Sequence, residues 1–482
     1  SKGPADSGLA KPDFCTPGGN VYSANSHGSN TEGIVVNASF KNNVIRKSGT
    51  SMSTPAASAL AVLVFQYFRD GYYPGIKKDS GASITPSSCL LRAVLINTAI
   101  KPSTLTPESK SSHNNNVGFG VPILDNALGF TGNGFRIVDN ETIPSDSHRV
   151  YTINTNSNSV DLNVTLVYLD PPLDTDNEAI FFADLDLYIK SPNGNIYMGN
   201  NISDGESFTL IERVIIDKEE IPAEGGVFEI HVISSKYPIE STKISYSIAV
   251  NGPFEQSNLE KNPLYLISKE ATDNECPKNC NGNGNCNKGM CVCNDGFVGP
   301  YCSIAVSPIK DGESYDLPYE YGQIKYFKLP LNDPTLGNGV EVSFDIVKSF
   351  NLGPVYFCTS FNENPGKIWN AGWECHLACP PPEDAEEDKD YPFFQNYTIK
   401  VPVNENPSAM NIALYSSYYE KKNVGLNNIK LKRTAPSKGP TIEPTSSSGD
   451  KKKVNSFPLL AIILVSIVAV LVVASIIILI FL

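Results

Sequence analysis

The stretch Gly49-Thr50-Ser51-Met52-Ser53-Thr54-Pro55 precedes a long apolar run that ends at Phe68. Nearly every position of this run is apolar, which predicts a helix buried on all sides rather than an amphipathic one. Pro55 suits the first turn of such a helix, because its missing N–H costs nothing there. Ser51 is therefore expected just before the helix N-terminus, where free N–H groups and the helix dipole favour a developing negative charge.

Other short motifs on both sides of Ser51 belong to one pattern. They are Ser1, Gly3-Pro4, Gly8, Lys11-Pro12-Asp13, Pro17-Gly18, Leu91–Ala99, Gly118-Phe119-Gly120 and Asp125-Asn126-Ala127. With the stretch around Ser51, they resemble the subtilisin-like serine proteases, although Thr16 stands where that family usually has Ala. The Gly-x-Ser-x-Gly motif of the α/β-hydrolases does not fit, because Ser53 replaces its second Gly. The resemblance implies that residues 1–130 are the C-terminal part of an α/β, parallel-sheet protease domain.

The resemblance also implies acyl transfer on a protein or peptide substrate. The Ser51 hydroxyl would attack a peptide carbonyl, a His would accept its proton, and an Asp would orient that His. The backbone N–H of Ser51 would supply one oxyanion donor and an Asn side chain the other. No cofactor is required for this chemistry. The competing structural interpretation is a Ser that only caps a core helix.

The catalytic partners of Ser51 are missing from the expected places. In the family, the Asp, the His and the oxyanion Asn precede the segment that begins at Ser1, so we expect this chain alone to be inactive. Of the five His residues, only His27 precedes Ser51, and its setting predicts a surface loop. Asp13 belongs to a structural motif. Two functions are therefore open: a serine endopeptidase, or a non-catalytic cell-surface adhesion or receptor protein built on a degenerate protease domain.

The length and the charge limit the class of protein. A chain of 482 residues indicates roughly three or more domains. The net charge of −13 argues against nucleic acid as a partner.

Six of the eleven cysteines lie close together, in the spacing Cys276-x3-Cys280-x5-Cys286-x4-Cys291-x-Cys293-x8-Cys302. Over residues 270–303 this spacing resembles an EGF-like module. The resemblance implies an oxidising compartment and the pairs Cys276–Cys286, Cys280–Cys291 and Cys293–Cys302. A zinc site would need Cys-x2-Cys pairs or added His, and neither is present. Of the others, Cys15, Cys89, Cys358, Cys375 and Cys379, we expect Cys358 to pair with Cys375 or Cys379.

All-β domains are expected on both sides of the EGF-like module. Alternating runs at 160–168 and 226–233 predict strands of a domain over 131–252. Similar runs at 322–329 and 340–347 predict a second β-sandwich over 304–432. The EGF-like and sandwich modules are candidates for protein or glycan ligands.

Residues 184–200 carry a further resemblance. Asp184-Leu-Asp-Leu, followed by Tyr197-Met-Gly-Asn, is similar to the C-terminal jelly-roll barrel of some bacterial subtilases, with Ala183 in place of an Asn. Some family members bind Ca²⁺ near this domain. Asp184 and Asp186 alternate on one strand and would share a face, which makes a structural Ca²⁺ site conceivable. We favour a plain pair of carboxylates at a strand edge.

The C-terminal residues predict a membrane anchor. Residues 433–456 are rich in Pro, Ser and Thr and predict an extended stalk. Residues 457–482 are apolar and long enough to cross a bilayer core of about 30 Å, which predicts one transmembrane helix. A type I anchor is favoured over a GPI signal with small residues at 446–450. Signal-dependent delivery and an extracellular or lumenal chain agree with five sequons, at Asn37, Asn140, Asn163, Asn201 and Asn396.

Overall fold

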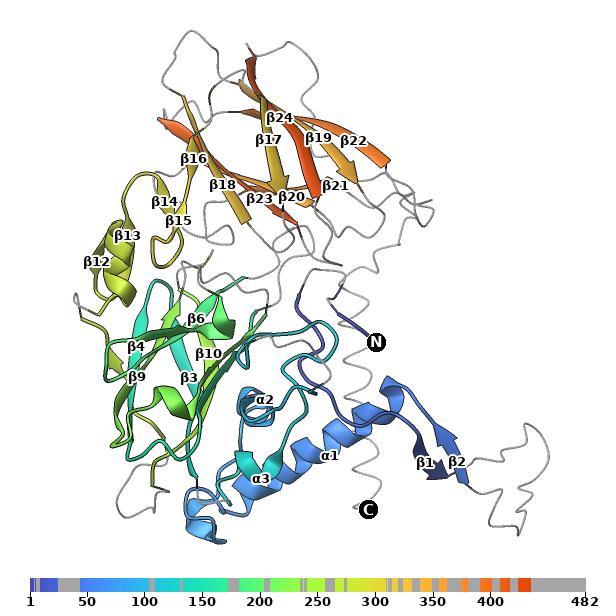
Figure 1. Cartoon of the computed structure of the whole chain (residues 1–482), viewed down its shortest axis with the longest axis vertical. Coiled ribbons are helices and arrows are strands. Elements are labelled where there is room, and N and C mark those ends of the chain that lie inside the picture. The colour runs from blue at the N-terminus through green and yellow to red at the C-terminus, as the bar shows by residue number, and fades with distance from the viewer. Residues whose placement is uncertain are drawn as a thin grey trace, which may run out of the picture. The chain divides into compact units, whose positions relative to one another are not determined.

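The chain divides into two compact units, Ser1–Ala435 and Pro436–Leu482, and the residues described by the computed structural model all lie in the first (Figure 1). They are residues 1–3, 5, 9–24, 44–103, 109–130, 133–171, 182–202, 209–234, 237, 241–255, 265–272, 275–308, 310, 314–319, 324–331, 339–348, 355–361, 374–379, 391–400, 408–416 and 424–434. Within these ranges, no helix is both long and apolar enough to cross a membrane. The transmembrane helix predicted over 457–482 and most of the predicted stalk lie outside the described residues.

The described part of residues 1–130, called the N-terminal segment below, has more helix than strand. Its elements are β1 (Val21–Ala24), β2 (Val44–Lys47), α1 (Thr50–Arg69), a 3₁₀ turn at Ser80–Ala82, α2 (Ser88–Asn97) and α3 (Leu124–Ala127). The parallel sheet that we expected is not found in the described part of this segment, where β1 and β2 pair antiparallel. Its helices pack instead against a sheet formed by residues further along the chain.

Helix α1 begins earlier than the sequence predicts. It starts at Thr50, so Ser51 is its second residue rather than a residue before it, and Pro55 lies inside the helix. The hydroxyl groups of Ser53 and Thr54 donate to the Thr50 carbonyl at 3.2 and 2.8 Å. These side-chain bonds support the turn that precedes the proline.

The burial of α1 also differs from the prediction. Val64 is fully buried, whereas Val62 is 64% exposed and Leu63 is 52% exposed. Only one stripe of α1 faces α2 and the shared core, so the described residues cover one side of the helix. An all-apolar run therefore forms a helix with one buried and one exposed side.

A β-sandwich, called the first sandwich below, follows the N-terminal segment. One sheet has the order β3 (Gly134–Pro144), β10 (Lys243–Gly252), β5 (Leu162–Tyr168), β8 (Ile211–Ile216). The other has the order β11 (Lys269–Glu270), β4 (His148–Thr155), β9 (Gly226–Ser234), β6 (Leu185–Lys190), β7 (Ile196–Met198). All neighbouring strands pair antiparallel, and alternate residues such as Leu185, Leu187 and Ile189 enter the core between the sheets.

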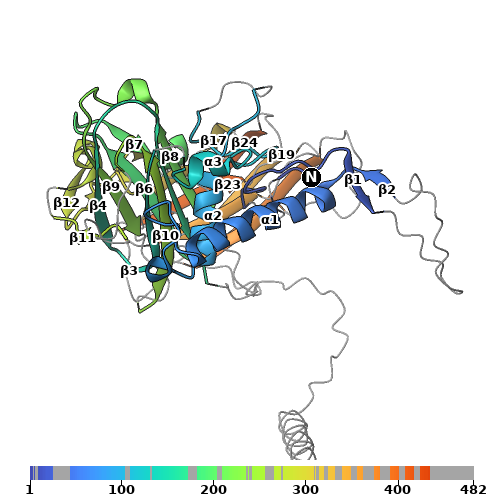
Figure 2. The same ribbon diagram turned by 90° about the horizontal axis from the view of Figure 1, so that it is seen from below.

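The first sandwich and the N-terminal segment share a second core. Helix α2 lies between α1 and the sheet that contains β10 (Figure 2). The outer face of this sheet contributes Phe135, Ile137, Val167, Ile211 and Ala249, which pack with the buried residues of both helices. This sheet is therefore buried on both faces.

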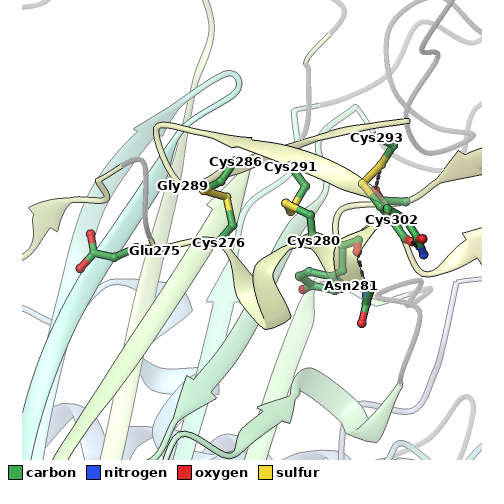
Figure 3. Close-up of a disulfide and its surroundings, with 12 residues drawn as sticks. Glu275, Cys276, Cys280, Asn281, Cys286, Gly289, Cys291, Cys293 and Cys302 are labelled. Carbon is green, nitrogen blue, oxygen red and sulfur yellow. Dashed lines mark hydrogen bonds between the residues drawn. A yellow bond between two sulfur atoms is a disulfide. The ribbon is translucent and has the colours of Figure 1, made fainter. Parts of the chain in front are cut away.

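Residues 275–305, called the cysteine module below, are held together by disulfides rather than by a hydrophobic core (Figure 3). They join Cys276 to Cys286, Cys280 to Cys291, and Cys293 to Cys302, which are the pairs that the resemblance implies. Its elements are a 3₁₀ stretch at Pro277–Gly282, β12 (Gly284–Asn287), β13 (Met290–Cys293), β14 (Phe297–Val298) and β15 (Ile304–Ala305). Lys288 and Gly289 form the two-residue turn between β12 and β13, and both have positive φ, as a type I′ turn requires.

Two further sheets occupy residues 307–434. One has the order β16 (Ser307–Pro308), β18 (Ile324–Pro330), β23 (Ala409–Ser416), β20 (Val355–Ser360), β21 (Glu374–Cys379). The other has the order β17 (Ser314–Tyr319), β24 (Val424–Thr434), β19 (Gly339–Lys348), β22 (Tyr391–Lys400). Cys358 is disulfide-bonded and lies opposite Cys375 in the register of β20 and β21, whereas Cys15 and Cys89 are free thiols.

Candidate functional site

The residue before α1 determines how the helix presents Ser51. Gly49 has φ 150° and ψ 172°, a region that side-chain-bearing residues avoid. Its carbonyl accepts from the N–H groups of Met52 and Ser53 at 3.0 and 3.3 Å, so the helix starts directly after it. Ser51 is exposed, and its N–H is among the first of the helix, which have no carbonyl in a preceding turn. The chain thus places a nucleophilic hydroxyl beside N–H donors at the positive end of a 20-residue helix.

A neighbouring segment holds this helix start in place. The N–H of Gly49 donates to the Gly18 carbonyl at 2.9 Å. The hydroxyl of Thr16 donates to the Ser53 carbonyl at 2.6 Å. A Cβ on Gly18 would lie 2.8 Å from the Gly49 carbonyl oxygen, so the close approach requires glycine. Thr16, which departs from the family's usual Ala, thereby adds a hydrogen bond to the first turns of α1.

Asp13 ties the same segment to α2. Its carboxylate accepts from Arg92 at 2.9 Å and from Lys11 at 2.7 Å. Burial opposes ionisation of Asp13, but Arg92 and Lys11 outweigh it and hold the pKa of the carboxyl below its ordinary value. The Asp13 carbonyl also accepts from the N–H of Phe119 at 2.9 Å. Asp13 is thus a structural residue, as its motif predicts.

The first sandwich binds both ends of α2. At its start, the Ser87 hydroxyl donates to Asp139 at 2.5 Å and accepts from the N–H of Leu90 at 3.0 Å. At its end, the Arg213 guanidinium donates to the carbonyl oxygens of Ile96 and Ala99 at 3.0 and 3.1 Å, and also to the Lys110 carbonyl. Arg213 is 1% exposed, so a buried cation neutralises the negative end of the α2 dipole.

An amide network continues this junction between α2 and the sheet. Asn97, at the last position of α2, donates to the Asn251 side chain at 2.8 Å and accepts from the Thr165 hydroxyl at 2.9 Å. Asn251 in turn donates to the carbonyl oxygens of Asn126 and Ala127. The sequence offered no signal for the contacts of Asn97, Asn251 and Arg213, because their partners are far away along the chain.

Three histidines have described side chains, His113, His148 and His231, and none of the three is hydrogen-bonded to Ser51. His113 is engaged with the Pro12 carbonyl at 2.9 Å, and burial lowers its pKa. His148 and His231 contact each other in the first sandwich. His27 lies outside the described residues. The structure therefore brings the start of α1 together with the motif around Thr16 and Gly18, whereas the three described histidine side chains are bonded elsewhere.

The acidic pair proposed for Ca²⁺ is buried, and Asp186 lies on the face of β6 opposite to the core residues Leu185, Leu187 and Ile189. Asp184 is 5% exposed and Asp186 is 4% exposed, and β6 lies between β9 and β7 rather than at a sheet edge. Burial, together with nearby Asp184, raises the pKa of Asp170 to about 6. In the described part of the chain, the only three metal-type ligands within 4.8 Å of one another are Cys276, Cys280 and Cys291. Their sulfurs belong to disulfides, so they do not form a metal site.

The five sequons lie in different settings. Asn140 and Asn201 are exposed, and Asn163 is half-buried on β5, which has a neighbouring strand on each side. Asn396 is on β22, and Asn37 lies outside the described residues. Their glycosylation stays a prediction.

Comparison with known proteins gives the N-terminal segment a family. Residues 1–130 match the model of the subtilase family (Peptidase_S8). This range contains the turn at Gly49 and the motifs around Asp13 and Phe119. Residues 1–130 belong to the subtilase family. Residues 276–305, within the cysteine module, match the model of the Teneurin-like EGF domain.

The chain also has curated relatives. The serine protease/ABC transporter B family protein tagD of Dictyostelium discoideum is 41% identical over 101 residues, which is 20% of this chain and 6% of tagD. The tagA protein of the same organism is 29% identical over 280 residues, which is 52% of this chain and 15% of tagA. Mouse Teneurin-3 is 61% identical over 31 residues, or 6% of this chain and 1% of Teneurin-3. The chain thus spans a small part of each of these relatives.

Proposed function

We propose that this chain is part of a subtilisin-like serine endopeptidase in which Ser51 is the nucleophile. The observation that carries the proposal is the turn at Gly49, which exposes Ser51 at the N-terminus of α1 within a segment that matches the subtilases. In the reaction, the Ser51 oxygen attacks a peptide carbonyl and forms an acyl-enzyme, which water then hydrolyses. The N–H of Ser51 stabilises the oxyanion.

The base that accepts the Ser51 proton is not His113, His148 or His231, because these side chains are hydrogen-bonded elsewhere. Residues supplied by the full-length protein would complete the triad. This chain alone is then expected to be inactive towards peptides, since loss of the base costs several orders of magnitude in rate.

A fluorophosphonate probe tests the proposal in the full-length, processed protein. We expect the probe to label the wild type at Ser51 and to leave Ser51→Ala unlabelled. Ser58→Ala is the matched control, because Ser58 is an exposed serine on the same helix, and labelling should persist. Absence of labelling in the correctly folded wild type would refute the protease and favour the adhesion or receptor function.

We further propose that residues 457–482 anchor the protein in a membrane, with the preceding domains extracellular or lumenal. The apolar length of the segment and the disulfides of the cysteine module support this placement. The full-length protein should resist extraction by alkaline carbonate. It should also stay on the membrane after treatment with a phospholipase that cleaves GPI anchors, whereas release would indicate a GPI anchor.

A further inference from the structure

The cysteine module lies against the outer face of the sheet that contains β4, β9 and β6. The Tyr301 ring of the module packs with Tyr188 and Ile233 in one buried cluster, and Met290 packs against it. The Tyr188 hydroxyl donates to the Glu275 carbonyl at 3.1 Å. These contacts form a small interface, which has few apolar residues beyond this cluster.

Two histidines form the polar part of this interface. His148 on β4 is 3% exposed and His231 on β9 is 1% exposed. A hydrogen bond of 2.9 Å connects His148 Nε2 with His231 Nδ1. The other nitrogen of His148, Nδ1, is 2.9 Å from the Gly289 carbonyl, at the hairpin turn of the module. The Tyr188 ring stacks on His231, with centroids 4.2 Å apart. The module, its sheet and the two rings thus form one continuous contact.

The hydrogen bonds determine where the protons of the pair lie. A carbonyl can only accept, so His148 Nδ1 carries a hydrogen and donates it to Gly289. In the neutral ring, His148 Nε2 is then an acceptor, and it receives the Nδ1–H of His231. If only His148 Nε2 gains a proton, the His231 hydrogen can move to His231 Nε2, which is 3.4 Å from Glu229, and the bond between the rings persists. Protons on both rings would point one N–H at another and break this bond. The hydrogen-bonded chain from Gly289 to His231 therefore excludes a doubly protonated pair.

The acidic groups on this face are Glu229, Glu275 and Asp186, and Asp186 is buried on β6 near Tyr301 of the module. His231 Nε2 has no hydrogen-bond partner and is 3.4 Å from Glu229, whose carboxylate is already paired with Lys190 at 2.8 Å. Glu275, on the module side, is paired with Lys269 at 2.6 Å.

Tyr188 is neutral, and Lys288 beside Gly289 adds positive charge to the turn. Burial lowers the pKa of His148 to about 4 and also lowers that of His231, where His148 and Lys190 add to the effect.

We propose that the His148–His231 pair is an acid-sensitive latch, which holds the cysteine module on the first sandwich when both rings are neutral and releases it when they are protonated. Proton linkage determines whether docking becomes stronger or weaker as the pH falls. An undocked histidine binds a proton below about pH 6.5, whereas the docked pair resists protonation. Docking is therefore fully stable above about pH 6.5 and weakens as the pH falls towards 4, by up to roughly tenfold per pH unit for each histidine.

Hydrogen exchange of the full-length protein between pH 4 and 8 tests the latch. Exchange rates are divided by the intrinsic rate at each pH, so that only protection is compared. We expect protection of β4, β9 and the hairpin around Gly289 to be constant above pH 7 and to fall at least tenfold between pH 6.5 and 4.5. Strand β10, in the core of the same sandwich, should stay protected and so reports that the fold is intact.

Three variants complete the test. His148→Gln can donate to Gly289 and accept from His231 but does not titrate, so its interface protection should change much less with pH. His113→Gln is the matched control, since His113 is a half-buried histidine with a lowered pKa but lies in the N-terminal segment. It should keep the wild-type profile. Gly289→Ala gives the undocked reference at all pH values, because its Cβ would lie 2.3 Å from His148 Nδ1.

Two results would overturn the latch. One is an unchanged acid response in folded His148→Gln. The other is wild-type interface protection that does not fall before that of β10, since the module then leaves only when the sandwich unfolds.

Discussion

Helices α1 and α2 belong to the same subtilase segment but are held in different ways. Seven of the ten residues of α2 are buried, against three of the twenty of α1. The first sandwich binds α2 at both ends, through Asp139 and Arg213. Only one stripe of α1 is covered, and its N-terminus is held by the segment that contains Thr16 and Gly18. The difference between the two helices indicates that the first sandwich supports the N-terminal segment through α2, whereas α1 presents Ser51 at an exposed surface.

Replacing Arg213 should give the largest loss of stability, because this residue binds the end of α2 to the first sandwich. Arg213→Met removes the side-chain donor to the buried carbonyl oxygens of Ile96 and Ala99 at the end of α2, where Ile96 keeps only backbone N–H donors. We expect the free energy of unfolding to fall by about 4 kcal/mol, as measured by denaturant unfolding. Arg149→Met is the control, since Arg149 pairs with the exposed Glu270, and it should cost about 0.5 kcal/mol or less. Similar losses in both variants would mean that α2 does not depend on its buried cation.

Two adjacent residues of α1 test its one-sided burial. Val64→Ala removes a fully buried side chain from the shared core and should cost about 2 kcal/mol. Leu63→Ala removes a larger side chain that is 52% exposed and should cost about 0.5 kcal/mol or less in the same unfolding assay. A larger cost for Leu63→Ala would show that another surface covers this side of α1 in solution.

The smallest expected effect concerns the start of α1. Thr16→Val keeps the shape of the side chain but loses the hydrogen bond to the Ser53 carbonyl, which should cost about 1 kcal/mol. Thr16→Ser keeps the hydroxyl and should recover much of the loss. Denaturant unfolding compares the three proteins. If valine is as stable as threonine, the departure from the family's Ala has no role in holding the helix.

Local motifs were predictable because they encode backbone conformation. A glycine is required at position 49 because φ is 150° there, and this backbone angle is a local property of the chain. The disulfides of the cysteine module follow a spacing that is shared with a known module. A helix start close to Ser51 was predicted for the same reason, although the helix begins at Thr50, before Ser51, and not after it.

The contacts between distant segments were not predictable. Arg213 and Ile96 are 117 residues apart, and His148 and Gly289 are 141 residues apart. Nothing in the neighbouring residues of either pair indicates the other partner. The apolar run of α1 predicted burial on every side, but burial depends on which surfaces reach the helix, and these come from other parts of the chain.

The sequence by itself determined the motif around Ser51, the spacing of the disulfide-bonded cysteines and the alternation of apolar and polar residues in the strands. Each of these depends on residues close together in the chain. Only the tertiary structure decided that the first sandwich supports α2, that α1 keeps one side exposed, and that a histidine pair joins the cysteine module to its sheet. These features depend on the burial and pairing of groups that the chain brings together only when it folds.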